Sequence, residues 1–226
     1  MNNKFTVLTM ALMMSTSAAF TAEQLLEVES FTGISLGTGM ISNITCGSSN
    51  TVTLRGDKKT LDKTEVRIDG DLLDISRKES AGSLFGKLLS NNNDDNGKVE
   101  VDVVTAGELS VFDISTGAII SVADCAVNTS QVTVDASTGS EITLNGVTSQ
   151  LTLDMSTGSM FNRRYESFVV DSVDFDMSTG AIANLCGANT VQGDASTGAI
   201  VYLAEGVDDS NVDLSIGAET SSKGCR

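Results

Sequence analysis

The chain has 226 residues, of which 30 are acidic, 14 are basic and none is histidine, and its formal net charge is −16. A surface this acidic repels phosphate backbones and anionic lipid headgroups, so nucleic acids and membrane surfaces are disfavoured as partners. The lack of histidine removes the most frequent general base and metal ligand. It also excludes Ser-His-Asp and Cys-His catalysis in their usual forms.

Residues 1–19 have the three parts of a secretory signal peptide. Lys4 supplies the positive charge, residues 5–14 form a short apolar stretch, and Ser17 and Ala19 fit the small-residue rule for cleavage after Ala19. The apolar stretch is too short to span about 30 Å of hydrocarbon as a membrane anchor. We therefore expect an exported protein, located in the periplasm, on the cell surface or outside the cell, with no integral membrane segment after cleavage.

Residues 20–226 have a length that suits one all-β domain, and residues 31–108 are predicted to form its elaborated first rungs. Alternating apolar residues predict four strands there, at residues 51–54, 65–68, 72–75 and 99–104. A loop insertion at residues 79–98 separates the last two. Its residues Leu84, Phe85, Leu88 and Leu89 fall on one helical face. We expect either a short helix that covers the open end of the fold or a solvated loop.

A five-residue pattern, Asp-x-Ser-Thr-Gly, recurs through residues 109–226, with Ile216 in place of threonine in the last copy. The six copies begin at Asp113, Asp135, Asp154, Asp176, Asp194 and Asp213. Successive copies start 18 to 22 residues apart, and apolar residues flank the aspartates, as Phe112 and Ile114 flank the first. This alternation is typical of a strand with one buried face, and a second alternating run follows each glycine.

Each unit has room for two or three short strands and none for a crossover helix, so it cannot bury its apolar face alone. Stacking the units in parallel, about 4.8 Å apart, buries a continuous core and satisfies the backbone hydrogen bonds between rungs. The shared glycine marks a corner that requires a positive φ or a close backbone approach. The sequence therefore predicts a single-domain, all-β parallel β-helix (β-solenoid) of about seven rungs, with residues 35–40 as an earlier copy of the repeat.

The repeats resemble the head GIN domain family, whose members are labelled autotransporter adhesins and carry tandem Asp-Leu-Ser-Gly-Ala-Gly units. Residues 31–34 (Phe-Thr-Gly-Ile) and 70–75 (Gly-Asp-Leu-Leu-Asp-Ile) are similar to the opening strands of that family. The resemblance covers roughly residues 28–220. It implies a right-handed β-helix and little about activity. One departure is the threonine of the repeat, which stands where the family usually has glycine.

The six repeat aspartates are candidate binding residues, because their apolar neighbours face inward and the aspartates therefore face outward. Stacked carboxylates about 4.8 Å apart repel one another by about 0.9 kcal/mol in water, and more strongly near a protein surface. Such a row calls for a compensating partner, and Ca²⁺ is one cation that takes carboxylate and hydroxyl oxygens. The alternative is that each aspartate accepts hydrogen bonds from the serine and backbone of its own turn. No other metal or cofactor is predicted.

Arg163, Arg164 and Tyr165 lie in a longer insertion between the third and fourth repeats. Insertions in solenoids often map to a binding face, so these residues are candidates for contact with a partner. A second hypothesis is that the two arginines act in catalysis together with nearby carboxylates. The plain alternative is a surface loop whose arginines meet an acidic body.

Four cysteines in an exported chain suggest two disulfides. Cys46 and Cys125 lie seven and eight residues after equivalent corner glycines, so they face each other if those rungs are neighbours. Cys186 and Cys225 lie six and eight residues after their glycines, but a whole rung separates them. That second pairing requires the chain end to bend back. We predict Cys46–Cys125 and Cys186–Cys225.

The leading hypothesis is a non-catalytic, exported, adhesin-like binding module whose partner is a surface glycan or protein of unknown identity. One alternative is a structural envelope protein that self-associates end to end through exposed strands. Another is a carbohydrate-active β-helix enzyme that relies on carboxylates, although the sequence singles out no catalytic residue.

Overall fold

The computed structural model describes residues 22–78, 97–163 and 167–225. The predicted signal peptide, most of the insertion at residues 79–98, and Arg164 and Tyr165 lie outside the described residues. Within the described part of the chain, the search for a helix long and apolar enough to cross a membrane finds none.

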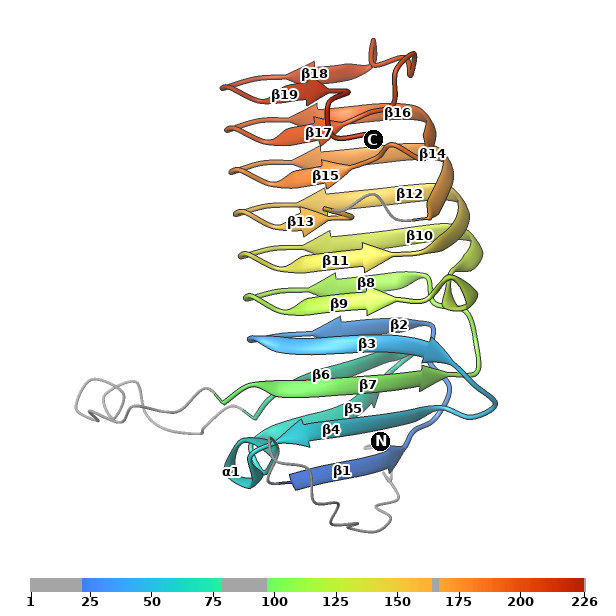
Figure 1. The fold of residues 1–226 in the computed structure, drawn as a ribbon, viewed down its shortest axis with the longest axis vertical. Helices are drawn as coiled ribbons and strands as arrows, with labels where there is room; N and C mark the ends of the chain where they lie inside the picture. The colour runs from blue at the N-terminus through green and yellow to red at the C-terminus, as the bar shows by residue number, and fades with distance from the viewer. Residues whose placement is uncertain (1–21, 79–96, 164–166, 226) are drawn as a thin grey trace, which may run out of the picture.

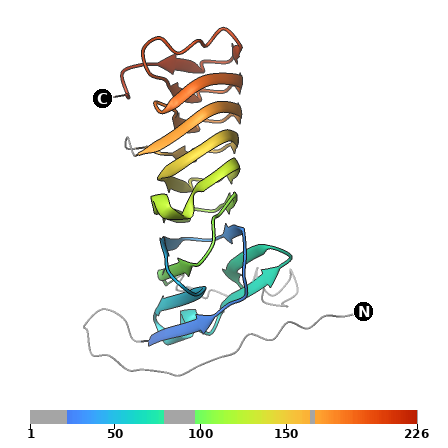
Figure 2. The same cartoon turned by 90° about the vertical axis from the view of Figure 1, so that its right-hand side faces the viewer.

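The protein is a rod built from two long sheets that enclose a core between them (Figures 1 and 2). In spatial order, sheet A contains β1 (Ala22–Glu27), β4 (Thr51–Gly56), β7 (Val99–Thr105), β3 (Met40–Cys46), β9 (Ile119–Val122), β11 (Glu141–Leu144), β13 (Met160–Phe161), β15 (Ile182–Asn184), β17 (Ile200–Tyr202) and β19 (Glu219–Ser221). Sheet B contains β18 (Val212–Leu214), β16 (Ala188–Ala195), β14 (Phe168–Met177), β12 (Gly146–Met155), β10 (Asn128–Ala136), β8 (Val111–Ile114), β2 (Gly33–Leu36), β6 (Leu72–Arg77) and β5 (Thr64–Asp69).

One strand of sheet B and the next strand of sheet A form a rung, and neighbouring rungs pair in parallel. The rungs are β2–β3, β8–β9, β10–β11, β12–β13, β14–β15, β16–β17 and β18–β19. In Figure 1 the sheet A strands of these rungs run rightward in front, their sheet B strands run leftward behind, and the chain rises from rung to rung, so the winding is right-handed. The predicted parallel β-helix is confirmed. The number of rungs is seven if the end rungs, β2–β3 and β18–β19, are counted with the five regular rungs between them.

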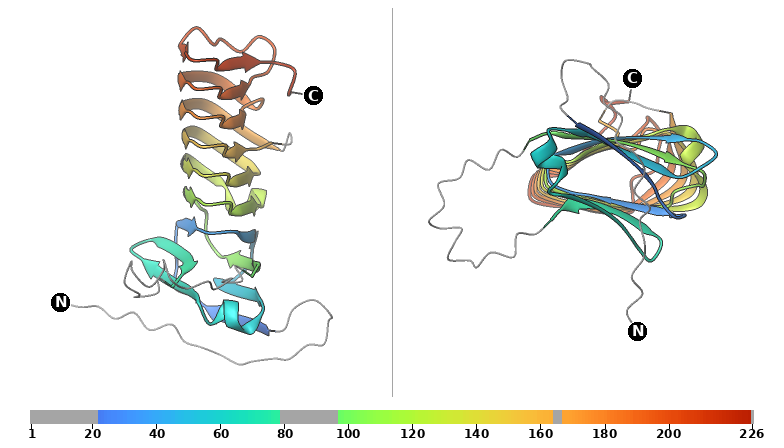
Figure 3. Two further views of the ribbon diagram at one scale, coloured as in Figure 1. Left: turned by 90° about the vertical axis from the view of Figure 1, so that its left-hand side faces the viewer. Right: turned by 90° about the horizontal axis from the view of Figure 1, so that it is seen from below.

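The N-terminal part of the chain forms a base, made of β1, β4, β5, β6, β7 and the short helix α1 (Lys58–Leu61). It lies on the side of the first rung, β2–β3, that faces away from the repeats. β6 and β7 pair in parallel with the first rung, whereas β1, β4 and β5 are antiparallel to their neighbours. Figure 3 shows that the base is broader than the stack above it. The four strands expected between residues 51 and 104 are all present.

The core consists of inward-facing columns to which each rung contributes one residue. Phe112, Val134, Leu153 and Phe175 occupy one such column on sheet B, and each is at most 3% exposed. Fully burying a side chain of this size stabilises the folded state by about 1.5–3 kcal/mol. The alternation of apolar and polar residues seen in the sequence therefore corresponds directly to the inside and outside of the rod.

Both predicted disulfides are present. Cys46 at the end of β3 and Cys125 in the 3₁₀ turn η1 (Asp124–Ala126) join neighbouring rungs, with their Cα atoms 6.2 Å apart. Cys186 and Cys225 have Cα atoms 5.4 Å apart. Their union requires the C-terminal tail to bend back past β17, where Gly224 lies so close to the ring of Tyr202 that a Cβ atom would collide with it.

The first disulfide closes the part of the chain that builds most of the base. It links residues 79 positions apart in the sequence, and a loop of that length lowers the entropy of the unfolded chain by the equivalent of about 4 kcal/mol. The chain leaves the stack after β3, builds the base and returns at β8. The disulfide therefore joins the end of β3 to the turn that follows β9, in the rung by which the chain re-enters the stack. The bond therefore stabilises the pairing of β3 with β9, which are neighbours in the sheet although β4 to β8 lie between them in the sequence.

Three buried serines, Ser42, Ser140 and Ser159, carry hydroxyl groups that have no hydrogen-bond partner among the described residues. Ser140 and Ser159 are 0% exposed, and their Oγ atoms are unpaired. They occupy the inward position after the corner glycine, where three other rungs have the buried alanines Ala118, Ala181 and Ala199. Burying an unpaired hydroxyl costs free energy, so these serines destabilise the core.

Replacing these serines with alanine is expected to stabilise the protein. Each of Ser140→Ala and Ser159→Ala should raise the free energy of unfolding by about 1 kcal/mol, because the unpaired hydroxyl is removed and the methylene packing is kept. Chemical denaturation of the single and double variants measures this, with Ala199→Ser as the reverse control, which should lower stability. Unchanged or reduced stability of the serine variants would show that these hydroxyls do have partners.

Candidate binding face

Each rung turns from sheet B to sheet A through a tight corner. In the rung β8–β9, the backbone N–H of Ala118 donates to the carbonyl oxygen of Ser115 at 3.2 Å, which closes a two-residue turn. The central residues Thr116 and Gly117 have φ values of 55° and 69°. Positive φ at both positions defines a type I′ turn. The glycine-marked corner predicted from the sequence is therefore confirmed.

Backbone hydrogen bonds connect these corners along the rod. The N–H of Gly117 donates to the carbonyl oxygen of Thr138 in the next rung at 2.9 Å, and the same bond recurs from Gly39 up to the carbonyl of Ile216. A β-branched residue rarely adopts positive φ, because the left-handed conformation costs about 1–2 kcal/mol. The hydrogen bond from the glycine of the preceding rung offsets that cost for each corner residue from Thr116 onward.

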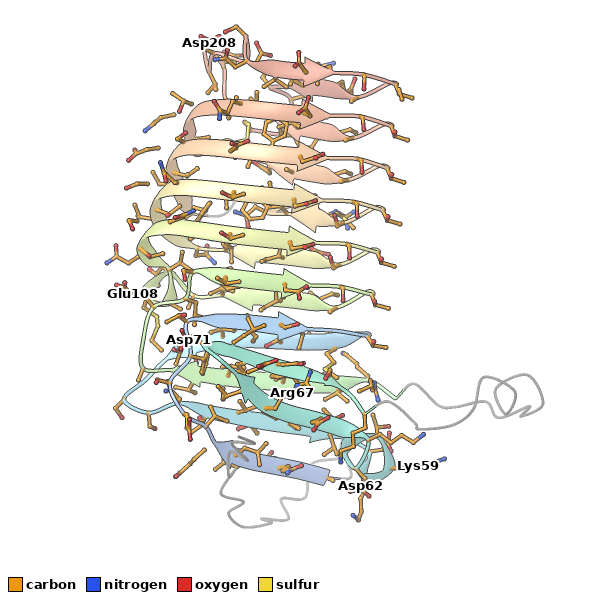
Figure 4. All side chains as sticks on the ribbon, turned by 180° about the vertical axis from the view of Figure 1, so that it is seen from behind. Lys59, Asp62, Arg67, Asp71, Glu108 and Asp208 are labelled. Carbon is orange, nitrogen blue, oxygen red and sulfur yellow. A yellow bond between two sulfur atoms is a disulfide. The ribbon has the colours of Figure 1, made fainter. Side chains whose placement is uncertain are left out.

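The six repeat aspartates form one straight row on the outer face of sheet B, which is the side seen in Figure 4. We call this row the Asp column, and its members are Asp113, Asp135, Asp154, Asp176, Asp194 and Asp213. All six are exposed. Ser35 continues the row next to Asp113, and Asp74 follows Ser35 in the base.

The end of this row nearest the base has hydrogen-bond donors, and the rest does not. Arg67 donates through Nε and Nη2 to Oδ2 of Asp74 at 2.9 and 2.6 Å. Ser35 Oγ donates to Oδ2 of Asp113 at 3.3 Å. The side chains of the other five members accept no hydrogen bond from any described residue. The hydrogen bonds expected from the serine and backbone of the same turn are therefore not made.

Two other aspartates on the same face accept hydrogen bonds from side chains of the neighbouring rung. Asp171 Oδ1 accepts a hydrogen bond from Asn189 Nδ2 at 3.0 Å, and Asp174 Oδ2 accepts one from Gln192 Nε2 at 3.2 Å. In both cases the amide comes from the next rung. Sheet B therefore supplies donors for these two carboxylates but leaves most of the Asp column with its oxygens directed to solvent.

Partial burial raises the pKa of the Asp135 carboxyl group above its ordinary value, and the neighbouring carboxylates of Asp154 and Asp113 raise it further. Both neighbours of Asp135 in the column are carboxylates. Its ionised form is therefore disfavoured in the folded protein.

Residues 30–206 match the sequence model of the family described as "Putative auto-transporter adhesin, head GIN domain". The chain belongs to this family. The match covers the first rung, the base except β1, and the repeats up to β17, so the Asp column as far as Asp194 and the corners up to Gly198 lie within the matched head GIN domain. A comparison with the curated proteins finds no match.

Solved structures share the fold of this head GIN domain at low sequence identity. A putative adhesin from Parabacteroides merdae is 13% identical with a TM-score of 0.66, over 88% of this chain and 78% of that one. A putative adhesin from Bacteroides fragilis is 9% identical with a TM-score of 0.59, over 88% and 94%. A protein named as a putative lipid-binding protein, from Parabacteroides distasonis, is 11% identical with a TM-score of 0.57, over 88% and 94%.

Arg163 is the described member of the predicted arginine insertion of this head GIN domain, and it is exposed. It follows Asn162, whose buried side chain accepts a hydrogen bond from the backbone N–H of Leu144 at 2.7 Å and donates to its carbonyl oxygen at 3.3 Å. The amide thereby replaces backbone pairing where the insertion begins. Nothing brings Arg163 to the Asp column, and Arg164 and Tyr165 lie outside the described residues.

The described residues contain no group of three or more acidic or cysteine side chains that could hold a metal ion. The Asp column places its carboxylates in single file, about 4.8 Å apart, whereas Ca²⁺ needs six to eight oxygens converging on one point. Calcium binding to the column stays a prediction. An ion bound there would need water molecules or a partner's oxygen atoms to complete its coordination.

Two features of this face escaped the sequence reasoning. The threonines of the corners adopt positive φ, and a Thr-Gly pair between two alternating runs is the signal that could have indicated a type I′ turn. The second is the extension of the row to Asp74, since only Ser35 was aligned with the repeat aspartates from the sequence, as part of the copy at residues 35–40. The sequence did not indicate that β6 pairs with β2 in the register that places Asp74 beside Ser35.

Neutralising Asp135 is expected to stabilise the protein at neutral pH. Because the pKa of its carboxyl is raised on folding, the native state gains stability below the ordinary pKa and loses it as the pH rises through the raised value. Asp135→Asn should therefore raise the free energy of unfolding at pH 7 by a few tenths of a kcal/mol, because water screens this exposed group, and should give no advantage below pH about 3.

Denaturant unfolding at pH 7 and at pH 3 measures this difference. Glu141→Gln, which removes one charge from sheet A, serves as the matched control. Equal effects of the two variants at both pH values would contradict the proposed crowding within the Asp column.

Proposed function

We propose that this head GIN domain is a non-catalytic, exported binding head that contacts its partner along the outer face of sheet B. The observation that supports this most directly is the Asp column, in which five successive carboxylates receive no hydrogen bond from the described residues. Neighbouring rungs do provide donors for Asp171 and Asp174. Charged groups held in a costly row without internal compensation are suited to a partner that supplies the compensation.

The charge distribution indicates the chemistry of that partner. Residues 106–222 contain 16 acidic residues and only two basic ones, Arg163 and Arg164. A field of one sign along a straight face accelerates association with a surface of the opposite sign. We therefore favour a protein partner with clustered lysine and arginine residues. Acidic glycans would be repelled, and neutral glycans would gain nothing from the charge.

Export has two supports in the chain. Residues 1–19 carry the pattern of a signal peptide, and the two disulfides form where the environment is oxidising. A binding role on a cell surface agrees with the adhesin description of the family. No observation on the described residues favours the carbohydrate-active alternative.

A charge-matched pair of triple variants tests the proposal. The first, Asp154→Asn with Asp176→Asn and Asp194→Asn, neutralises the middle of the column. The second, Glu141→Gln with Glu205→Gln and Glu219→Gln, removes the same charge from places outside the column. Both are compared with the unaltered chain for binding to immobilised basic proteins and neutral glycans over a range of salt concentrations.

We expect the unaltered chain to bind basic proteins, with an affinity that falls as salt increases. The column variant should lose at least five times more affinity than the control, because three adjacent carboxylates at one contact act together. If both variants lose affinity equally, only the overall charge matters and the face is not the binding site. Binding to neutral glycans alone would contradict the proposed partner.

A further inference from the structure

The two ends of the rod have a core that is only partly covered. Along the rod, the buried apolar side chains are at most 6% exposed. The apolar residues that pack on this core but remain partly exposed lie in the base and in the last coil, and they are Ala22, Val28, Val66, Ile68, Val207, Val212 and Ala218. The middle of the solenoid contributes none of these described residues. At both ends, therefore, apolar side chains that continue the core are partly exposed to solvent.

The C-terminal end, which we call the tip (residues 204–225), is the more open of the two. Leu214 is 45% exposed, whereas Met177 and Ala195, its partners in the same inward column, are at most 1% exposed. Ile216 takes the place of the corner threonine and is 77% exposed. Solenoids that remain single in solution end in a polar capping repeat. This tip instead places its two largest apolar side chains in solvent.

Among the described strands, each end also has one edge in each sheet that pairs with no further strand. At the tip the outermost strands are β19 in sheet A and β18 in sheet B, and at the base they are β1 and β5. Exposed edges present unpaired N–H and C=O groups that can pair with another chain. The directions are compatible, because two antiparallel steps, β1–β4 and β4–β7, leave β1 running in the direction of β19. Leu25 on β1 is 45% exposed beside this edge.

Charge distinguishes the two ends. The tip carries five acidic residues, Glu205, Asp208, Asp209, Asp213 and Glu219, and one described basic residue, Lys223. Residues 55–63, around α1 in the base, carry four basic and two acidic residues, whereas β1 carries two acidic residues, Glu23 and Glu27, of which Glu23 pairs with Arg55. Figure 4 shows Lys59 at the outer end of the base and Asp208 at the opposite end of the rod. Two tips would repel each other, whereas the part of the base around α1 offers the acidic tip an excess of positive charge.

We propose that copies of this chain associate head to tail, the tip of one rod docking on the base of the next. The contact covers Leu214 and Ile216 with the base of the neighbour, sets β19 beside the neighbour's β1, and brings the tip carboxylates near the lysines around α1. Such an interface is heterologous, so it leaves a free tip and a free base on every assembly. Rods of this kind grow into open filaments rather than stopping at dimers.

Two variants, each blocked at one end, test this arrangement. The tip-blocked variant is Leu214→Lys with Ile216→Lys, which replaces exposed apolar side chains with charges that the basic patch of the base repels. The base-blocked variant is Leu25→Glu with Lys59→Glu, which makes the base acidic like the tip. The shaft control, Val147→Lys with Val169→Lys, changes two valines that are 53% and 49% exposed on the side of the rod.

Molar mass is measured for the exported form of the chain by light scattering and sedimentation over a range of concentrations. The unaltered chain and the shaft control should form species that grow with concentration. Each blocked variant alone should remain a monomer. An equimolar mixture of the two should reach twice the monomer mass and no more, because one intact tip and one intact base remain available.

Three outcomes would overturn the proposal. The first is an unaltered chain that remains monomeric at every concentration. The second is a base-blocked variant that still dimerises, which would indicate contact between two tips. The third is a shaft control that loses association as the blocked variants do. Thermal unfolding of each variant identifies a folding defect, and Ile216→Lys alone, at a highly exposed turn position, is the substitute if the double tip variant is unstable.

Discussion

The structure depends on one repeated hydrogen bond, from the N–H of a corner glycine to the carbonyl oxygen of the corner residue one rung further along. It can form only if the peptide between the two corner residues points along the rod, and this requires positive φ at both. Glycine takes that conformation freely, whereas threonine takes it at a cost. The row of bonds compensates for the cost and fixes every corner directly above the one before.

Once the corners are aligned, equal offsets from the glycine become straight columns. Inward offsets give the apolar core, in which each rung covers the previous one. The outward offset two residues before the serine gives the Asp column, whose mutual repulsion the fold accepts because the corners leave no freedom to separate the carboxylates. The same alignment puts Cys46 beside Cys125. Core, charged face and covalent bond thus follow from a single geometric restriction.

Much of this could be predicted from the sequence, because a repeat with constant offsets carries its own register. The fold, both disulfides and the outward direction of the aspartates were accessible for that reason. The conformation of Thr116 was not, because β-branched residues rarely have positive φ and only the neighbouring rung makes it favourable here. The four-residue helix α1 was also missed, since its cap at Asp57 and its one buried leucine, Leu61, form no periodic pattern. The alternative in which each aspartate accepts hydrogen bonds from its own turn was wrong for all six members of the column.

The central claim is that the corners stack one above another in parallel register. Distance measurement between spin labels attached through non-natural amino acids at Thr116 and Thr197 tests it most directly. These corners are four rungs apart, so their backbones should be separated by about 19 Å with a narrow distribution. A broad distribution, or a separation above about 30 Å, would mean that the corners are not stacked at the spacing of β-strands, and the columns would then have no basis.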